Sequence, residues 1–199
     1  MPIVKILFMV LPRMEASLLT DALYFDTDCI SSFLWVNQEV LLTTMYSGEI
    51  HIPLSVYNEL SNPNIPHIKA KVDNMVASGH ADICSINVAT EEYDIFYQLT
   101  VHPIPPNRII GNGEAAALAF AKVKQATIAS NNLRDVLSYV DYYQLRLITT
   151  GDILIESLNR NLITEQVGNQ IWANMLNKRR KIGALTFSDY LSAHNSPKR

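Results

Sequence analysis

"GNGEAAALAFAKVKQATIASNNLRD", residues 111–135, joins a glycine turn, a small-residue segment, an apolar run and a polar tip. The alanine-rich segment 114–124 is composed of strong helix formers and predicts a helix. The apolar run 126–130 is short, as a buried strand is, and the segment 133–144 is expected to form the next helix. A helix, a short buried strand and another helix in succession are typical of an α/β fold.

The same alternation extends through the rest of the chain in both directions. Further strands are predicted over 22–26, 49–53, 81–86 and 145–149. Further helices are predicted over 29–37, 39–48, 53–62, 66–79, 89–100, 151–161, 164–181 and 186–194. Short apolar strands that alternate with helices predict an α/β domain whose central parallel sheet is covered by helices on both faces.

Length and composition place the protein among ordinary globular chains. The 199 residues fit one domain with a small appendage. Cys29 and Cys84 lie far apart in apolar surroundings, and we interpret both as buried thiols of a reducing, cytoplasmic compartment. The apolar start of the chain is too short to span a membrane, which takes about 20 residues. It also lacks a signal-peptide cleavage site, so we expect no membrane partner.

Charge is distributed unevenly along the chain. Residues 1–150 hold nine Lys or Arg and fifteen Asp or Glu, whereas residues 151–199 hold seven and four. An acidic centre beside a basic carboxy-terminal part suits a metal site that acts on a polyanion. An ordinary solvated surface explains the same distribution equally well.

Several acids follow predicted strands. Asp26 ends the first strand, Glu59 lies in the helix after the second, and Glu114 opens the helix before the strand 126–130. Asp135 follows that strand. Ligands of open α/β sheets bind beyond the carboxyl ends of the strands, so we expect these carboxylates to meet at one edge.

Grouped carboxylates repel one another and need a counter-charge. A divalent cation supplies it, and hard oxygen ligands favour Mg²⁺ or Mn²⁺. Such an ion can lower the pKa of a bound water and orient its attack on a phosphodiester. The pattern therefore predicts metal-dependent nuclease chemistry.

Each acid taken alone has a simpler explanation. Asp26 could cap the following helix, as Asp at a strand–helix junction does. Glu59 could be a solvated helix residue, and Glu114 could favour the helix dipole. Asp135 could pair with a nearby Arg or Lys. The prediction depends on their joint placement.

Four motifs together resemble a known family. The segments 24–29 (YFDTDC), 53–60 (PLSVYNEL), 111–121 (GNGEAAALAFA) and 126–136 (ATIASNNLRDV) are similar, in order and spacing, to the PIN-domain nucleases. That family includes the toxins of VapC-type toxin–antitoxin pairs. The resemblance implies a PIN-like three-layer fold over residues 21–160. Residues 1–20 would then be an arm or strand, and residues 161–199 a helical extension packed on the same domain.

The resemblance assigns roles to individual residues. The first strand ends in an Asp-Thr-polar motif, Asp26, Thr27 and Asp28, in which the first residue binds metal and the other two support it. Glu59 ends a Pro-x-x-Val-x-x-Glu pattern, and Glu114 opens the alanine-rich helix. These acids are implied to be metal ligands and catalytic residues.

The fourth acid depends on the alignment. Some family members carry Asp-Asp where Asn131 and Asn132 stand here, in which case the fourth acid is missing. Others carry a Thr-Arg-Asn-x-x-Asp pattern, which makes Asp135 the fourth acid, with Ser130 and Asn132 as supporting ligands. Both alignments stay open.

A basic cluster lies in the carboxy-terminal part of the chain. Its side chains could hold an RNA backbone through phosphate contacts. A solubilising helix end, where cations favour the dipole, is the simpler interpretation. The cluster consists of Lys178, Arg179, Arg180 and Lys181.

The residues and the resemblance together predict a cytoplasmic endoribonuclease that depends on Mg²⁺ or Mn²⁺. The toxin of a toxin–antitoxin pair is one form of this function that the resemblance implies for the chain. RNA, an antitoxin and a second copy of the chain are the implied partners. Two other functions stay open. One is a catalytically silent nucleic-acid-binding module of the same fold, which Asn131 and Asn132 favour. The other is a metal-dependent phosphatase that uses the same acids.

Overall fold

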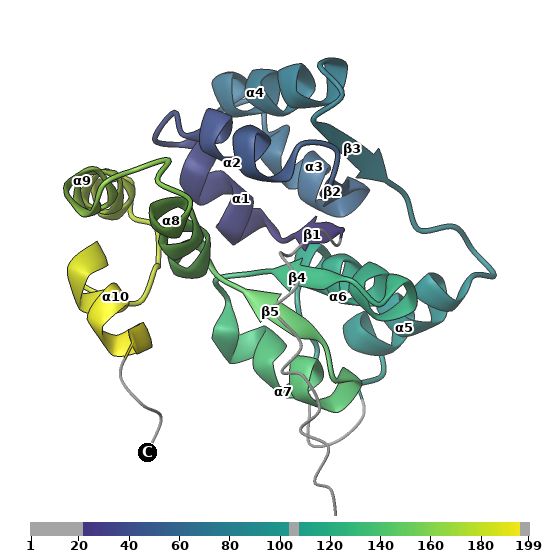
Figure 1. The fold of residues 1–199 in the computed structure, drawn as a ribbon. Helices are drawn as coiled ribbons and strands as arrows, with labels where there is room; N and C mark the ends of the chain where they lie inside the picture. The colour runs from purple at the N-terminus through teal and green to yellow at the C-terminus, as the bar shows by residue number, and fades with distance from the viewer. Residues whose placement is uncertain (1–21, 104–107, 196–199) are drawn as a thin grey trace, which may run out of the picture.

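One parallel sheet organises the molecule. The computed structural model describes residues 22–103 and 108–195, so the arm predicted over residues 1–20 lies outside the described residues. The sheet has the strand order β3-β2-β1-β4-β5, and all neighbours run parallel (Figure 1). Its strands are β1 (Leu23–Phe25), β2 (Ile50–Pro53), β3 (Ala81–Cys84), β4 (Thr127–Ala129) and β5 (Arg146–Ile148). The predicted α/β class is confirmed.

Helices join the strands and continue after the last one. They are α1 (Thr27–Leu34), α2 (Glu39–Tyr46), α3 (Leu54–Leu60), α4 (Pro66–Ala77), α5 (Glu91–Thr100), α6 (Asn112–Lys124), α7 (Leu133–Tyr143), α8 (Thr150–Asn159), α9 (Glu165–Asn177) and α10 (Phe187–Asn195). Every helix predicted from the sequence is present. None of the helices that the structure describes has the length and hydropathy needed to cross a membrane.

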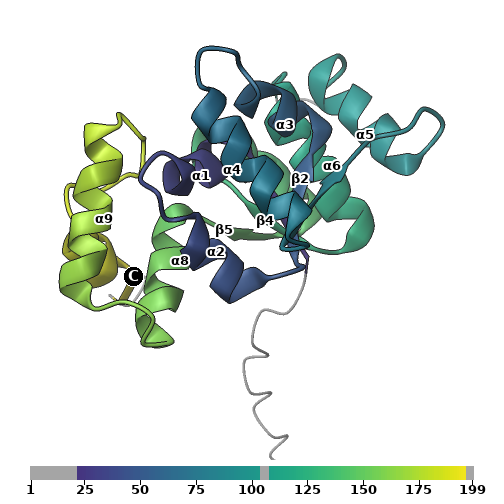
Figure 2. The ribbon, with the colours of Figure 1, turned by 90° about the horizontal axis from the view of Figure 1, so that it is seen from above.

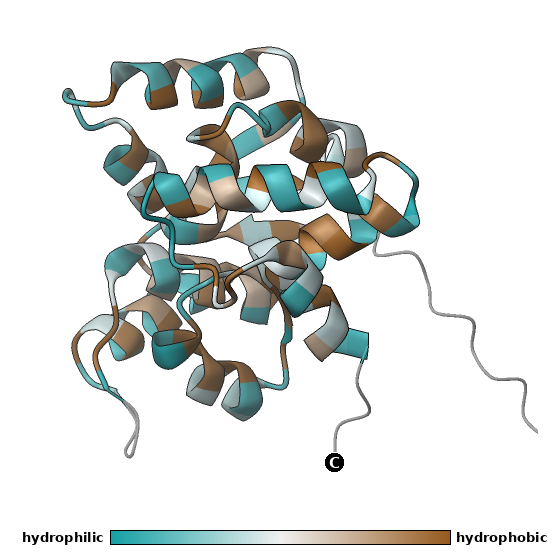
Figure 3. Ribbon diagram, turned by 90° about the vertical axis from the view of Figure 1, so that its left-hand side faces the viewer, coloured by the Kyte–Doolittle hydropathy of each residue, from teal (hydrophilic) through white to brown (hydrophobic). Residues whose placement is uncertain are grey.

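The side chains of the sheet alternate between two hydrophobic cores, as a strand period of two requires. Leu23 and Phe25 belong to the core under α1–α4 and α8–α10, whereas Tyr24 belongs to the core under α5–α7. Figure 2, seen from above, looks down on α1–α4, with β4 and β5 behind them. In Figure 3, hydrophobic and hydrophilic residues alternate along the helices, because each helix has one face toward a core.

Helix α6 is buried almost all round. It packs against β1 and β4 on one side and against α5 and α7 on others. The alanines Ala115, Ala117 and Ala119 are fully buried. Small side chains let the neighbouring elements approach this helix closely, which explains the alanine-rich composition.

Because α6 is enclosed, Ala117→Leu is expected to lower the free energy of unfolding by about 1–3 kcal/mol through overpacking. The control is Ala70→Leu, at an exposed position of α4. Urea unfolding measures both variants. If the two variants were equally stable, α6 would have room around Ala117 for a larger side chain, and the close packing of this helix would be contradicted.

The start of α6 differs from the prediction. Gly111 has extended backbone and is the N-cap, so the helix begins at Asn112 and Glu114 is its third residue. The predicted start at residue 114 is therefore too late, although Glu114 still lies in the first turn. The chain also differs from expectation at Cys84, whose side chain is only half-buried, whereas Cys29 is buried as predicted.

The carboxy-terminal helices pack against α8, at one end of the molecule in Figure 1. Trp172 of α9 and Phe187 of α10 are fully buried and belong to the same core as β1. The Trp172 indole N–H donates to the Ala184 carbonyl, at 3.0 Å. Residues that follow β5 therefore contribute to the core of the sheet domain.

Candidate active site

The strand order reverses between β1 and β4, which are neighbours in the sheet. The chain moves outward from β1 through β2 to β3, and then restarts at β4 and moves to β5 on the other side. Helix α1, after β1, packs in one core, and α7, after β4, packs in the other. The chain therefore leaves β1 and β4 toward opposite faces of the sheet. In an open parallel sheet, ligands usually bind in the crevice at the carboxyl ends of two such strands.

Asp26 lies at that crevice, directly after β1, and is 1% exposed. One carboxylate oxygen accepts the Cys29 backbone N–H at 2.7 Å, so Asp26 caps α1. The other accepts a short hydrogen bond from the Ser130 hydroxyl. Burial raises the pKa of Asp26 to about 7, although both hydrogen bonds oppose this, and the charges of Asp28 and Glu114 raise it further.

Asn132 joins the acids of α6 and α7. Its amide nitrogen donates to Glu114 Oε1 and to Asp135 Oδ2, both at 2.9 Å. Its backbone N–H donates to the Ser130 hydroxyl at 3.1 Å, and that hydroxyl in turn donates to Asp26. A continuous chain of hydrogen bonds therefore links three of the four predicted acids.

Glu59, the one predicted acid outside this chain of hydrogen bonds, approaches the start of α6 from α3. Its Oε2 accepts the Thr27 hydroxyl at 2.5 Å. A Cβ on Gly113 would lie 3.1 Å from Thr27 Oγ1 and 3.2 Å from Glu59 Oε1, so these groups pack against the first turn of α6. A side chain at residue 113 would crowd both, which accounts for the glycine just before Glu114.

The acids meet through intervening polar groups. No group of three or more His, Cys, Asp or Glu side chains within 22–103 and 108–195 is arranged so that it could hold a metal ion. Asp26, Glu114 and Asp135 are connected instead through Ser130 and Asn132. Glu59 contacts Thr27, the residue after Asp26. Asp28, predicted as a supporting residue, is exposed, and its backbone carbonyl accepts the Ser32 hydroxyl at 2.7 Å.

Arg108 completes the surroundings of Asp135. Its Nη2 lies 2.9 Å from Asp135 Oδ1 and also donates to the Arg134 carbonyl at 3.0 Å. The expectation that Asp135 could pair with a basic residue is met, in addition to its contact with Asn132. Arg108 lies in the proline-containing loop before α6, where no periodic pattern singles it out.

Asn131 has a different task from its neighbour. Its amide nitrogen donates to Thr150 Oγ1 at 2.8 Å, and its amide oxygen accepts the Thr150 backbone N–H at 2.9 Å. Both ends of the amide are used to fix the start of α8. The sequence pattern indicates Asn131 only as the place of a missing acid, because its structural role depends on a contact with Thr150, 19 positions away.

The basic cluster lies against α1. Lys178 Nζ and Arg180 Cζ lie 5.8 and 5.9 Å from the centroid of the Trp35 ring, and Arg180 Nη1 donates to Ser31 Oγ at 3.2 Å. Lys181 lines a groove of about 360 Å³. The groove is also lined by Asn131, Asn132, Leu133, Arg134, Thr149, Ile182, Gly183 and Tyr190. Lys181 and Arg134 therefore lie in a groove that is also lined by Asn132, the hydrogen-bond donor to Glu114 and Asp135.

A comparison of the chain with models of protein families finds no match, and a comparison with curated proteins finds none either. The function of the crevice is therefore inferred from the contacts and charges of the residues that form it.

Proposed function

We propose that the protein is a PIN-like, metal-dependent ribonuclease whose site is the crevice between β1 and β4. The observation that carries the proposal is the hydrogen-bonded chain from Asp26 through Ser130 and Asn132 to Glu114 and Asp135. It gathers acids from segments far apart in the sequence at the ligand-binding edge of the sheet. A cytoplasmic location, an antitoxin partner and a homodimer belong to the same proposal through the family resemblance.

The donor types, carboxylates and other hard oxygens, suit Mg²⁺ or Mn²⁺, although the described residues do not present three of these acids as a ready-made ligand group. Mg²⁺ is commonly held by one or two carboxylates, with waters and substrate phosphates as the other ligands. Glu114 and Asp135 direct one oxygen each at a single amide nitrogen, so their charges converge. These two acids and Asp26 would hold the ion, with Glu59 beside them. When bound, the ion supplies a water of lowered pKa and neutralises charge on the phosphate.

The remaining residues position these acids. The Ser130 hydroxyl fixes one oxygen of Asp26, and the Thr27 hydroxyl fixes Glu59. A phosphate approaching this acidic crevice is repelled unless cations offset the charge. Arg134 and Lys181, which line the adjoining groove, are placed to neutralise the RNA backbone.

One observation favours a second function. The Asn132 amide stands between Glu114 and Asp135 and satisfies both carboxylates without a metal ion. A protein of the same fold that binds RNA in the basic groove without cutting it needs no metal ion, and the Asn132 amide would suffice to pair the two acids.

The experiment compares an unstructured RNA and a generic phosphomonoester as substrates, each with Mn²⁺ and with EDTA. We expect cleavage of RNA only, lost in EDTA and lost or strongly reduced in Glu114→Gln, which removes one of the carboxylate ligands. The matched control is Glu91→Gln, at an exposed position of α5. Binding of RNA without cleavage would establish the silent module, and hydrolysis of the phosphomonoester alone would establish a phosphatase.

A further inference from the structure

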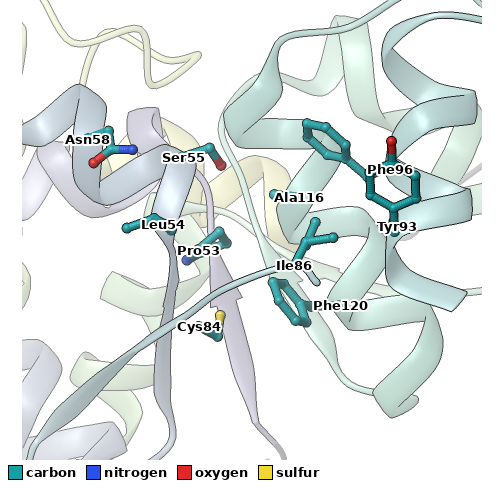
Figure 4. Close-up of a pocket in the computed structure, with 10 residues that line it drawn as sticks. All are labelled: Pro53, Leu54, Ser55, Asn58, Cys84, Ile86, Tyr93, Phe96, Ala116 and Phe120. Carbon is teal, nitrogen blue, oxygen red and sulfur yellow. The ribbon is translucent and has the colours of Figure 1, made fainter. Parts of the chain in front are cut away.

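A pocket of about 250 Å³ lies where the ends of β2 and β3 meet α3, α5 and α6 (Figure 4). Ser55 and Asn58 of α3 form one wall, and Tyr93 and Phe96 of α5 form the opposite wall. Phe120 of α6 lies between them. The pocket therefore combines aromatic surface with two polar side chains.

Two of the three aromatic rings of the pocket, Phe120 and Tyr93, contact other rings. Phe120 is 6% exposed and stacks on Tyr24, with centroids 5.3 Å apart. Tyr93 stacks on Tyr97 at 6.3 Å. Tyr93 and Phe96 are only partly buried, so ring surface remains open to the pocket. Fixed aromatic surface that faces solvent is a common feature of ligand sites.

The polar wall has unused hydrogen-bonding capacity. The exposed Asn58 side chain makes no hydrogen bond to any residue in 22–103 or 108–195. Ser55 Oγ donates to the Asn112 carbonyl at 3.1 Å, which leaves its lone pairs available. A free amide offers a donor and an acceptor side by side, the combination that pairs with the edge of a nucleobase.

The pocket and the candidate active site are built in part on the same two helices, α3 and α6. Asn58 lines the pocket, and the next residue of α3 is Glu59. Ala116 lines the pocket from α6 and follows Glu114 by two residues. The hydrogen bond of Ser55 reaches the turn that begins α6. The start of α6 therefore contacts the pocket wall through Ser55 and packs beside Glu59 of the candidate site at Gly113.

We propose that this pocket binds a single nucleobase of the RNA strand next to the phosphate that is cut, and so gives the ribonuclease a base preference. The inference rests on the proposed function. Stacking on Tyr93 and Phe96 suits the flat face of a base, and the Asn58 amide suits its edge. An apolar peptide side chain would use the rings and leave the amide unpaired.

Two measurements test the proposal on the full chain. In the first, a random-sequence RNA pool is cut with Mn²⁺ and the new ends are sequenced. We expect a preference for one base at a fixed position, reduced about tenfold in Phe96→Ala, because base–aromatic stacking supplies it. Asn58→Ala, an exposed change that leaves the packing intact, is expected to change which base is preferred. Tyr142→Ala and Asn74→Ala, exposed residues of α7 and α4 outside the pocket, are the controls.

The second measurement is independent of cleavage. AMP, GMP, CMP and UMP are added in EDTA, and saturation-transfer NMR reports which of them contacts the protein. We expect base protons of one nucleotide to receive saturation, and Phe96→Ala to remove the transfer. Nucleotide binding of this kind in a protein that cuts no RNA would support the pocket and overturn the ribonuclease. Cleavage whose base preference is absent, or unchanged in both pocket variants, would overturn the pocket and leave the ribonuclease. If the protein bound a phenylalanine-containing peptide and none of the four nucleotides, the proposal that the pocket binds a nucleobase would also be overturned.

Discussion

Asp26→Asn is expected to make the metal-free protein more stable at neutral pH while abolishing RNA cleavage. The buried carboxyl has a pKa of about 7, against an ordinary value of 3.8. The native state therefore binds this proton more tightly than the unfolded chain does, and stability falls as pH rises through the interval between these values. The neutral amide carries no such cost, and its oxygen can still accept the Cys29 N–H.

The size of the effect follows from the shift. A difference of about three pKa values sets an upper limit near 4 kcal/mol, so we expect a gain of about 2–4 kcal/mol at pH 8. In a chain of this length that raises the unfolding temperature by about 5–10 °C. Thermal unfolding in EDTA should show the gap between variant and wild type widening from pH 5 to pH 8. Added Mn²⁺ should then raise the unfolding temperature of the wild type only.

The control is Asp28→Asn, which removes a neighbouring but exposed carboxylate. It is expected to change the stability of the metal-free protein little. If Asp26→Asn is instead less stable than the wild type at pH 8, the hydrogen bonds from Cys29 and Ser130 outweigh the cost of burial. Asp26 would then be a structural cap of α1 and the case for a metal ligand would be lost.

The fold could be predicted because its signals are local. Strands such as β1 and β4 are buried on both faces and therefore form short apolar runs, and polar residues, Asp26 after β1 and Ser130, Asn131 and Asn132 after β4, separate them from the helices that follow. The order of the strands in the sheet has no comparable local signal in the sequence. It is fixed by pairing between β1 and β4, which lie far apart in the sequence, and no single segment encodes it. The start of α6 was misplaced because Gly111 caps the helix without a side chain.

The site was predictable only in part, for the same reason. Asp26 was identified from its place after a strand and Ser130 through the family resemblance, but the hydrogen bond between them joins residues 104 positions apart. The bridging role of Asn132, the Arg108 ion pair and the hold of Asn131 on α8 depend on contacts between elements. Sequence pattern identifies which acids reach the edge of the sheet and says little about the neutral groups that separate them.

Those neutral groups lead to the second large effect. In Asn132→Asp, a carboxylate replaces the amide that donates to Glu114 and Asp135. Three acids would then meet without a donor between them, and their repulsion is expected to destabilise the metal-free protein by about 1–3 kcal/mol. A divalent cation would reverse the penalty, so the variant should bind Mn²⁺ at least about tenfold more tightly than the wild type. Calorimetric titration with Mn²⁺ and unfolding in EDTA measure the two effects.

Asn131→Asp is the matched comparison and decides between the two family alignments. Its amide holds Thr150 at the start of α8, so this change is expected to cost stability without a gain in Mn²⁺ affinity. A gain at residue 131 and none at residue 132 would mean that the metal lies nearer to α8 than to the acids of α6 and α7. An Asn132→Asp protein whose Mn²⁺ affinity and stability both match the wild type would show that the two carboxylates do not converge in solution. The proposed metal centre would then have no basis.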